Sequence, residues 1–489
     1  MVQKSNTKKA FHAVSSQTLV TIGLGVVEIV SFSIMSRLLT KVDFGYYASI
    51  SAIVGIFAIF SEAGIGAAVI QKKDADKNYI NNAFTICLIL GTVLTLILFS
   101  FSGVIAKGIA DASLKLPLML ISGTLLLNTV SSVSRSILVK QLKFLKVGLI
   151  NFVALVITTI VAIILALKGY GYYAILCKAI LESVIICILY FVYAKTRFRL
   201  ALDKETFKSI WSFSGWLLAS GLFRRLSQQV DKLLMPRMLS IEALGAYNRP
   251  KEFIGKISVR LNGIFDTALF PVLSGIQDKK ASLQNAFRKA LSLMNIGGTF
   301  LCLLFFFNSE LLIRIFFGEK WLELDTIFKV FSISLMFNVN GRLADCYLRS
   351  LGLTKSQFFF RVAETITKIV AVVVGAIWNM LGVATAVVLA DVVIKIIKII
   401  FVGRKIELTI QIIFAVVFKS WKFLLVLLPI MGAALCFLPH TLVGNIVLLA
   451  LFCLVSIILF VCLPSFVGET YKLEAYPKLL SVLHIKRKK

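Results

Sequence analysis

Ionisable side chains within long apolar stretches are the residues of this sequence best placed to do chemistry. The densest set lies on two successive stretches and comprises Arg224, Gln228, Asp231, Lys232, Lys256 and Arg260. The first four follow one another at i, i+4, i+7 and i+8, the spacing of one face of an α-helix. Inserting such a group into hydrocarbon costs about 2.5–3.5 kcal/mol, so each should face a wet cavity or a partner. Because cations outnumber carboxylates here, a cavity lined by these residues would attract an anion such as a pyrophosphate or an acidic sugar.

Two lone carboxylates, Glu28 and Glu62, lie near the middle of other apolar stretches. Each could carry a proton or Na⁺ through a transport cycle, or could serve helix packing through a hydrogen bond. Glu62 is the first choice for an ion site because no basic residue lies within a helical turn or two of it. The competing interpretation is that removal of the product outside the membrane gives transport its direction, without any ion.

Further ionisable residues follow in the second half of the chain: Arg342, Asp345, Glu364, Lys368, Asp391, Lys395 and Lys398. Asp345 with Arg342, like Asp231 with Lys232, is equally well interpreted as a structural ion pair. Lys395 and Lys398 lie close enough to a cytoplasmic helix end for membrane topology to explain them. Arg249 is similarly close to a connection, from which it could snorkel to the interface.

The sequence gives no sign of bond-making chemistry. Its eight cysteines are scattered through apolar stretches without CxxC spacing, which is typical of small core side chains. Its three histidines lie far apart and cannot form a ligand cluster. No nucleophile elbow, Walker A loop, HExxH or Gly-rich nucleotide loop occurs. We therefore expect no catalytic residue, no metal and no cofactor: the protein is not an enzyme.

The elements that must position these charges are transmembrane helices. Hydrophobic residues make up 58% of the chain and charged residues only 16%, a composition far from that of soluble domains. An all-α polytopic membrane protein is therefore expected. Runs of about 20 apolar residues can cross a bilayer, and about fourteen are found, near 15–39, 45–70, 82–106, 116–139, 147–167, 171–194, 211–236, 243–273, 287–308, 324–348, 357–378, 381–402, 420–438 and 442–466.

Lysine and arginine alternate between the connections of these spans. The N-terminus, every second connection and the tail are basic, whereas the alternate connections hold few cations. The positive-inside rule then places both termini and all the basic connections in the cytoplasm, and requires an even number of spans. Much of the net charge of +29 would lie against anionic lipid head groups. Nucleic acid is not an expected partner, because no soluble basic stripe exists to present to it.

The chain also contains an internal repeat at a shift of 200 residues. MSRLLT at 35–40, followed by FGYY at 44–47, corresponds to MPRMLS at 235–240, followed by LGAY at 244–247. So long a period indicates two homologous halves, and paired halves in transporters commonly flank a site that opens to alternate sides. We expect a six-helix lobe at 1–200, a second at 201–405, and two additional helices with a basic cytoplasmic tail at 406–489.

Several segments carry a resemblance to a known family. They are LTKVDFGYY (39–47), EAGIGAAVIQKK (62–73), KQLKF (140–144), DKLL (231–234), LGAYNR (244–249) and FPVLSGIQD (270–278). In this order, over roughly residues 12–405, the chain resembles the Wzx polysaccharide flippases of the multidrug/oligosaccharidyl-lipid/polysaccharide (MOP) exporter superfamily, within the WzxC/TuaB-like branch. The last two spans are similar only in hydropathy.

The resemblance implies a fold, a substrate class and partners. The fold would be the V shape of MATE-like transporters, with pseudo-twofold six-helix lobes and two C-terminal helices. The substrate would be a polyprenyl-pyrophosphate-linked oligosaccharide, moved by alternating access across the cytoplasmic (inner) membrane of a bacterium during synthesis of exopolysaccharide, capsule or O-antigen. Membrane lipids, a polysaccharide polymerase, glycosyltransferases and H⁺ or Na⁺ are the possible partners.

Three alternatives remain open at this stage. A cation-coupled multidrug exporter would share the fold, but carboxylates would dominate its cavity. A lipid II flippase would also need a cationic cleft. A membrane-embedded glycosyltransferase or polymerase would need an acid/base cluster and a long extracytoplasmic loop, and neither is found.

Overall fold

Helices account for the regular structure of the computed structural model, which describes residues 2–61, 64–72, 76–109, 111–195, 198–439, 441–467 and 471–477. No strand occurs among these residues. By its internal contacts the chain divides into two compact units, Met1–Asn248 and Arg249–Lys489. The boundary falls later than the repeat suggests, because α8 and the start of α9 pack with the first unit; the division into lobes at 200/201 stays a prediction.

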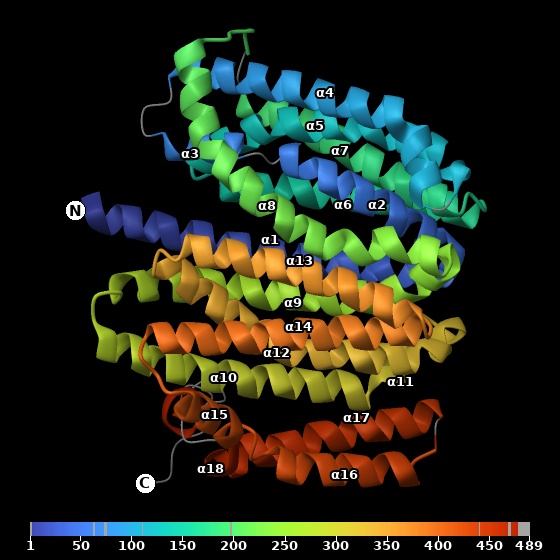
Figure 1. Ribbon diagram of the computed structural model, residues 1–489, viewed down its shortest axis with the longest axis vertical. Coiled ribbons are helices and arrows are strands. Elements are labelled where there is room, and N and C mark those ends of the chain that lie inside the picture. Colours follow the sequence, from blue (N-terminus) through green and yellow to red (C-terminus); the bar gives the residue numbers. More distant parts are fainter. Residues whose placement is uncertain are drawn as a thin grey trace. The chain divides into compact units, whose positions relative to one another are not determined.

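The first unit is a bundle of long helices. It comprises α1 (Val2–Leu38), α2 (Lys41–Ser61), α3 (Ile65–Gln71), α4 (Lys77–Ile109), η1 (Ala112–Leu114), α5 (Lys115–Lys140), α6 (Phe144–Leu167), α7 (Tyr172–Ala194), α8 (Lys204–Met238) and the first turns of α9 (Ile241–Gly275). α5 packs between α4 and α7, α6 lies between α7 and α1, and α2 packs along α8 (Figure 1). A core that includes Ile50, Leu98, Leu118 and Leu125 joins α2, α4 and α5.

One expected span is broken. The apolar run at 45–70 forms two helices, α2 and α3, rather than one. Gly64 precedes α3 with φ at 74°, a left-handed backbone conformation that glycine adopts without steric penalty. Hydropathy alone could not locate this break, because the residues on both sides of it are apolar.

The second unit contains the rest of α9 and the remaining helices. They are α10 (Lys280–Phe307), α11 (Ser309–Phe316), η2 (Glu319–Leu324), α12 (Asp325–Ser350), α13 (Thr354–Ala376), α14 (Met380–Lys405), α15 (Ile410–Lys419), α16 (Leu424–Phe437), α17 (Leu442–Ile457), η3 (Ile458–Cys462), α18 (Pro464–Val467) and η4 (Tyr471–Ala475). α12 packs against both α10 and α14, and α13 packs against α14 (Figure 1).

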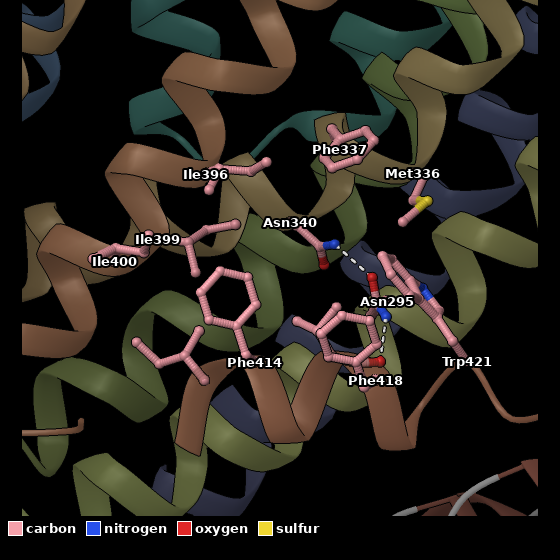
Figure 2. Close-up of a pocket in the computed structure, with 12 residues that line it drawn as sticks. Asn295, Met336, Phe337, Asn340, Ile396, Ile399, Ile400, Phe414, Phe418 and Trp421 are labelled. Carbon is pink, nitrogen blue, oxygen red and sulfur yellow. Dashed lines mark hydrogen bonds between the residues drawn. The ribbon is translucent and has the colours of Figure 1, made fainter. Parts of the chain in front are cut away.

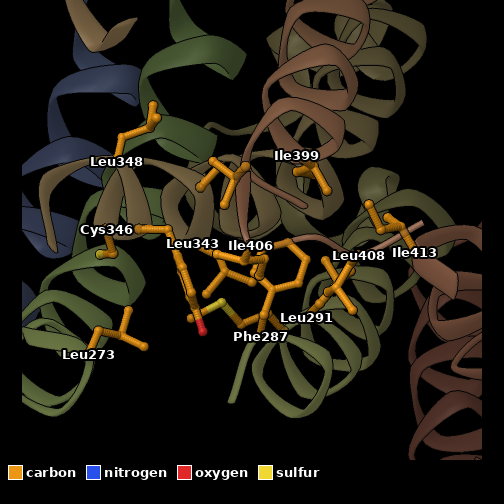
Figure 3. Close-up of a cluster of buried hydrophobic side chains, with 14 of the residues drawn as sticks. Leu273, Phe287, Leu291, Leu343, Cys346, Leu348, Ile399, Ile406, Leu408 and Ile413 are labelled. Atoms are coloured by element: carbon orange, nitrogen blue, oxygen red, sulfur yellow. The ribbon is translucent and has the colours of Figure 1, made fainter. Parts of the chain in front are cut away.

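Two apolar cores stabilise the second unit. Figure 3 shows the first, in which Phe287 and Leu291 of α10 meet Leu343 of α12 and Ile399 and Ile406 of α14. The second core joins α10 to the α16–α17 hairpin through a separate set of side chains: Ile296, Leu303, Phe307, Phe423, Leu427, Met431, Leu448, Phe452 and Leu459. The hairpin is therefore attached to the unit mainly through α10.

Eight helices of the described residues are long and apolar enough to cross a membrane, or nine when the bent pair α15 and α16, with its 48° angle, forms one span. Five more helices, α8, α9, α12, α13 and α14, coincide with the remaining expected spans. These are the helices that carry the ionisable side chains, which lower their mean hydropathy. The all-α polytopic fold is confirmed, while the number fourteen remains a prediction.

The connections of the first unit lie in two groups, one of basic connections and one of connections with few cations. Among the basic ones, the Lys140 ammonium donates to the Lys72 carbonyl, and Asn82 accepts a hydrogen bond from the backbone of Asp203. Among the others, Tyr172 N–H donates to Asp43 at 2.9 Å and the Arg237 guanidinium to the Gly108 carbonyl at 3.3 Å. This separation is what opposite membrane surfaces would require.

Candidate functional site: charged membrane helices

The expected stripe on α8 is divided by burial. Asp231 is 2% exposed and accepts hydrogen bonds from the Tyr247 hydroxyl at 2.7 Å and from the backbone N–H of Lys232 at 3.0 Å. It therefore links α8 to the start of α9. Arg224 and Gln228 are exposed and Lys232 is half-buried. The polar face that α8 leaves open thus consists of cations and an amide, while its carboxylate is engaged inside the unit.

On α9 a carboxylate lies between two cations. Glu252 Oε1 is 3.2 Å from Lys256 Nζ, and its Oε2 is 3.4 Å from Arg249 Nη1. Arg249 is only 4% exposed, so the expectation that it snorkels to the interface is wrong within this unit. The i, i+3 and i, i+4 spacing of the three residues explains the arrangement. Arg260 belongs to α9, but its side chain lies outside the described residues.

The strongest cluster of charge lies in the second unit, between α12, α13 and α14. Lys398 Nζ, on a side chain almost wholly buried, is 2.7 Å from Glu364 Oε1 and 3.1 Å from Asp345 Oδ1. Arg361 bridges the same two carboxylates, at 2.7 Å from Glu364 Oε2 and 2.8 Å from Asp345 Oδ2. Four charges from three helices thus form a closed ring of ion pairs.

A second cluster continues along the same helices. Lys368 Nζ of α13 is 3.1 Å from Asp391 Oδ1 of α14, and Lys395 Nζ is 3.5 Å from Asp391 Oδ2. Lys395 also donates to the Asn338 side-chain oxygen of α12, and the Asn338 amide donates to Ser258 of α9 at 3.4 Å. We call the ring and this extension the α12–α14 charge network.

The α12–α14 charge network corrects two expectations. Lys395 and Lys398 do not merely mark a cytoplasmic end, because both make ion pairs within the unit and Lys398 is buried. Asp345 makes its direct ion pairs with Arg361 and Lys398, across helices, rather than with Arg342 on its own helix. The sequence did contain a pattern that indicates this network. Ionisable residues recur at helical spacing, as on α8, at 361, 364 and 368 and again at 391, 395 and 398.

The network has more cations than carboxylates. Arg361, Lys368, Lys395 and Lys398 face Asp345, Glu364 and Asp391, four positive charges against three negative. Buried charges are tolerated only when paired and hydrogen-bonded, so the network must stay assembled for the unit to remain folded.

Of the two candidate ion-coupling residues, one is described. Glu28 of α1 is half-buried, one helical turn from Ser31. The Ser31 hydroxyl accepts a hydrogen bond from Lys178 of α7 at 2.8 Å, so a cation that the sequence did not single out lies near this position. Glu62 lies outside the described residues.

An apolar cavity of about 150 Å³ opens on the other side of α12 and α14. Phe414, Phe418 and Trp421 line one wall, and Ile396 with Ile399 the other (Figure 2). At its base the Asn340 amide donates to the Asn295 oxygen at 2.9 Å, and the Asn295 amide donates to the Ser420 hydroxyl at 2.6 Å. These bonds satisfy the Asn295 side chain and the Asn340 amide, whereas the buried Asn340 side-chain oxygen has no hydrogen-bond partner among the described residues. The remaining surface is apolar and suited to hydrocarbon.

Solved structures share this architecture. The lipid II flippase MurJ in an inward closed conformation superposes with a TM-score of 0.68 at 15% identity, over 91% of this chain and 99% of that one. An inward-facing MATE-family multidrug resistance transporter of the MOP superfamily gives 0.64 at 12% identity, over 78% of this chain and 94% of that one. The chain therefore has the fold of the MOP-superfamily transporters, as the resemblance implied.

The sequence comparisons identify a protein family for this chain. Residues 34–326 match the family model described as polysaccharide biosynthesis protein, and the chain belongs to that family. It is 24% identical to the teichuronic acid biosynthesis protein TuaB of Bacillus subtilis, over 69% of this chain and 71% of that protein. It is 23% identical to the lipopolysaccharide biosynthesis protein WzxC of Escherichia coli, over 73% of each. The succinoglycan biosynthesis transport protein ExoT of Rhizobium meliloti is 20% identical, over 77% of this chain and 76% of that protein.

Proposed function

We propose that this protein is a flippase that moves a polyprenyl-pyrophosphate-linked oligosaccharide from the inner to the outer leaflet of a bacterial cytoplasmic membrane. The observation that carries the proposal is the polysaccharide-biosynthesis family match over residues 34–326, on a chain with a transporter fold. Relatives named for teichuronic acid, lipopolysaccharide and succinoglycan biosynthesis support the same substrate class. Transport, not bond chemistry, is then the activity.

The head group is the part of the substrate that needs the protein. Its pyrophosphate charges and sugar hydroxyls cannot cross hydrocarbon without polar partners. We propose that Arg224, Gln228 and Lys232 on α8 attract this head group within the first unit. Lys256 on α9 would do so within the second unit, and the role of Arg260 stays a prediction. Asp231 holds the helix in place through Tyr247. Lys256 shares its charge with Glu252.

The polyprenyl chain needs only apolar surface. We propose that the cavity lined by Phe414, Phe418 and Trp421 accommodates a segment of it beside α14 (Figure 2). The α12–α14 charge network lies on another face of α14, where its cations are paired and largely buried.

The orientation and the energy source complete the proposal. Both termini would lie in the cytoplasm, as the alternation of basic connections indicates. An inward movement of H⁺ or Na⁺ could give direction, with Glu28 and Glu62 as carriers. The three carboxylates of the α12–α14 charge network are poor carriers, because lysine and arginine side chains already neutralise them. Glycosyltransferases would act before the flippase and a polymerase after it.

The test is a flipping assay in proteoliposomes, with a lipid-linked oligosaccharide whose accessibility to an added enzyme reports its leaflet. We expect protein-dependent movement, reduced by Arg224→Glu and reduced less by Arg224→Gln, because the role assigned is attraction of charge. Lys143→Glu, at an exposed connection, is the matched control and should flip normally. Movement of lipid II or a drug cation, but not of the oligosaccharide, would contradict the proposal in favour of the other members of the fold.

A further inference from the structure

The two copies of the internal repeat touch each other in the first unit. Gly45 lies near the start of α2 and Gly245 near the start of α9, at the repeat shift of 200. A Cβ atom on Gly45 would overlap the carbonyl oxygen of Ile241 and lie 2.7 Å from its Cγ2 atom. A Cβ atom on Gly245 would overlap the carbonyl oxygen of Lys41 and lie 2.8 Å from the Gly45 nitrogen.

This contact is reciprocal. Gly45 faces Ile241, and Gly245 faces Lys41. Because Ile241 is the repeat equivalent of Lys41, the two contacts correspond to each other under the repeat. Such a pattern is the signature of an interface across a twofold axis. Close backbone contact through glycine is also how membrane helices cross without intervening side chains. We call this contact the glycine crossing.

Each helix of the glycine crossing is tied to its own half of the chain. On α2, Asp43 accepts a hydrogen bond from the backbone of Tyr172, and the Tyr46 hydroxyl donates to Asp111 at 2.6 Å. On α9, the Tyr247 hydroxyl donates to Asp231 of α8. These bonds lie within two residues of the glycines, so each helix is held in place next to the crossing.

The glycine crossing also lies at the end of the helices where the cation-poor connections gather. The 39–41 and 239–241 connections lead directly into it, and the partners Asp111 and Tyr172 belong to the connections after α4 and α6. In the proposed orientation this end faces the outside of the cell.

We propose that the glycine crossing is the outer gate of the transport cycle, closed in this structure. The inference rests on the proposed function in two respects, alternating access and membrane orientation. It does not depend on the identity of the substrate. When the gate is closed, the backbones of α2 and α9 touch; to release a substrate outside, they must separate. A side chain at either glycine would hold them apart and favour the outward-open state.

The experiment compares Gly245→Leu with Gly255→Leu on the same helix, because a Cβ atom at Gly255 meets no atom within 4 Å. The readout is modification of a single cysteine, Gln228→Cys, by a membrane-impermeant maleimide added outside intact cells. Gln228 lies ten residues before the end of α8, about 15 Å inward at the rise of an α-helix. We expect Gly245→Leu to raise the labelling rate about tenfold or more, as a population shift would, and Gly255→Leu to leave it unchanged.

Smaller substitutions keep the test decisive if the leucine variants do not accumulate. Gly45→Ala and Gly245→Ala should each raise labelling, and the double variant should exceed either by less than the sum, because both act at one contact. Unchanged labelling in folded protein, or strictly additive effects, would overturn the gate. Faster labelling of the glycine variants, together with failure of the parent protein to flip the oligosaccharide in proteoliposomes, would support the gate while rejecting the proposed substrate.

Discussion

At the scale of single residues, the most consequential side chain is the ammonium of Lys398. It contacts Glu364 and Asp345 from a position almost without exposure. Lys398→Met should destabilise the protein by about 3–5 kcal/mol, because removing one member of a buried ion pair leaves the opposite charge uncompensated. Unfolding in detergent, followed by denaturant titration, measures the loss.

Two variants serve as controls for this prediction. Arg404→Met removes an exposed cation from the same helix and should change stability little. Adding Glu364→Gln to Lys398→Met should restore part of the loss, because Arg361 then faces a single carboxylate, Asp345. Equal stability of Lys398→Met and the parent protein would show that the network is not maintained in the folded state.

A second residue-scale prediction concerns pH. The Tyr46 hydroxyl and the backbone N–H of Ser113 donate to Asp111 and hold its pKa below its ordinary value of 3.8. A lowered pKa stabilises the fold above the unfolded pKa, and this stabilisation is lost as the pH falls through the folded pKa. Tyr46→Phe should therefore lower the melting temperature at pH 7, and the difference from the parent should shrink as the pH falls below about 4.

The control for this prediction is Tyr170→Phe, at an exposed tyrosine on the same group of connections. It should leave the melting temperature unchanged across the same range. A difference between Tyr46→Phe and the parent that persisted undiminished at low pH would assign the effect to another contact of the hydroxyl, such as the one with the Ser113 side chain, rather than to the Asp111 carboxylate.

The sequence predicted which charged residues share a helix face better than it predicted their partners. Helical spacing placed Arg224, Gln228, Asp231 and Lys232 on one face of a helix, but only the structure shows that Asp231 turns inward to Tyr247. Hydropathy marked Lys398 as close to a membrane surface, whereas it closes a ring across three helices. Pairing between helices depends on their packing, and a linear pattern does not contain that information.

At the scale of elements, two adjacent glycines of α10 give a matched test of helix packing. A Cβ atom on Gly298 would approach Cα and the carbonyl oxygen of Met336 on α12 to 3.1 Å, whereas one on Gly297 would meet nothing within 4 Å. Gly298→Val should therefore separate α10 from α12 and destabilise the protein, by about 1–3 kcal/mol for an overpacked site. Gly297→Val should cost little by comparison, and thermal unfolding of both variants in detergent provides the measurement.

The same pair shows why element positions are easier to predict than element contacts. Apolar runs located the long helices, since length and hydropathy are properties of a contiguous segment. They could not tell that Gly298 contacts a neighbour while Gly297 does not, nor that Gly64 divides the run at 45–70. An equal loss of stability in the two valine variants would indicate that backbone propensity, rather than the α10–α12 contact, sets the cost.

At the scale of the whole molecule, the alternation of charge predicts sidedness. A cysteine at exposed Ala112, after α4, should react with an impermeant maleimide in intact cells. A cysteine at exposed Lys77, the first residue of α4, should react only after permeabilisation. Native Cys436, Cys453 and Cys462 are exposed and must first be replaced by serine. Outside labelling at Lys77 would reverse the orientation and move the proposed gate to the cytoplasmic side.

The attachment of the α16–α17 hairpin has a consequence for how this chain can change over time. The hairpin meets α10 through bulky apolar side chains such as Phe307, Phe423 and Phe452. Between helices in lipid, such contacts require matching volumes rather than particular side chains. Mutation can therefore exchange one bulky residue for another along the hairpin while the rest of the protein remains under tighter selection. Divergence should be fastest there, in agreement with a family match that covers residues 34–326 and does not include the hairpin.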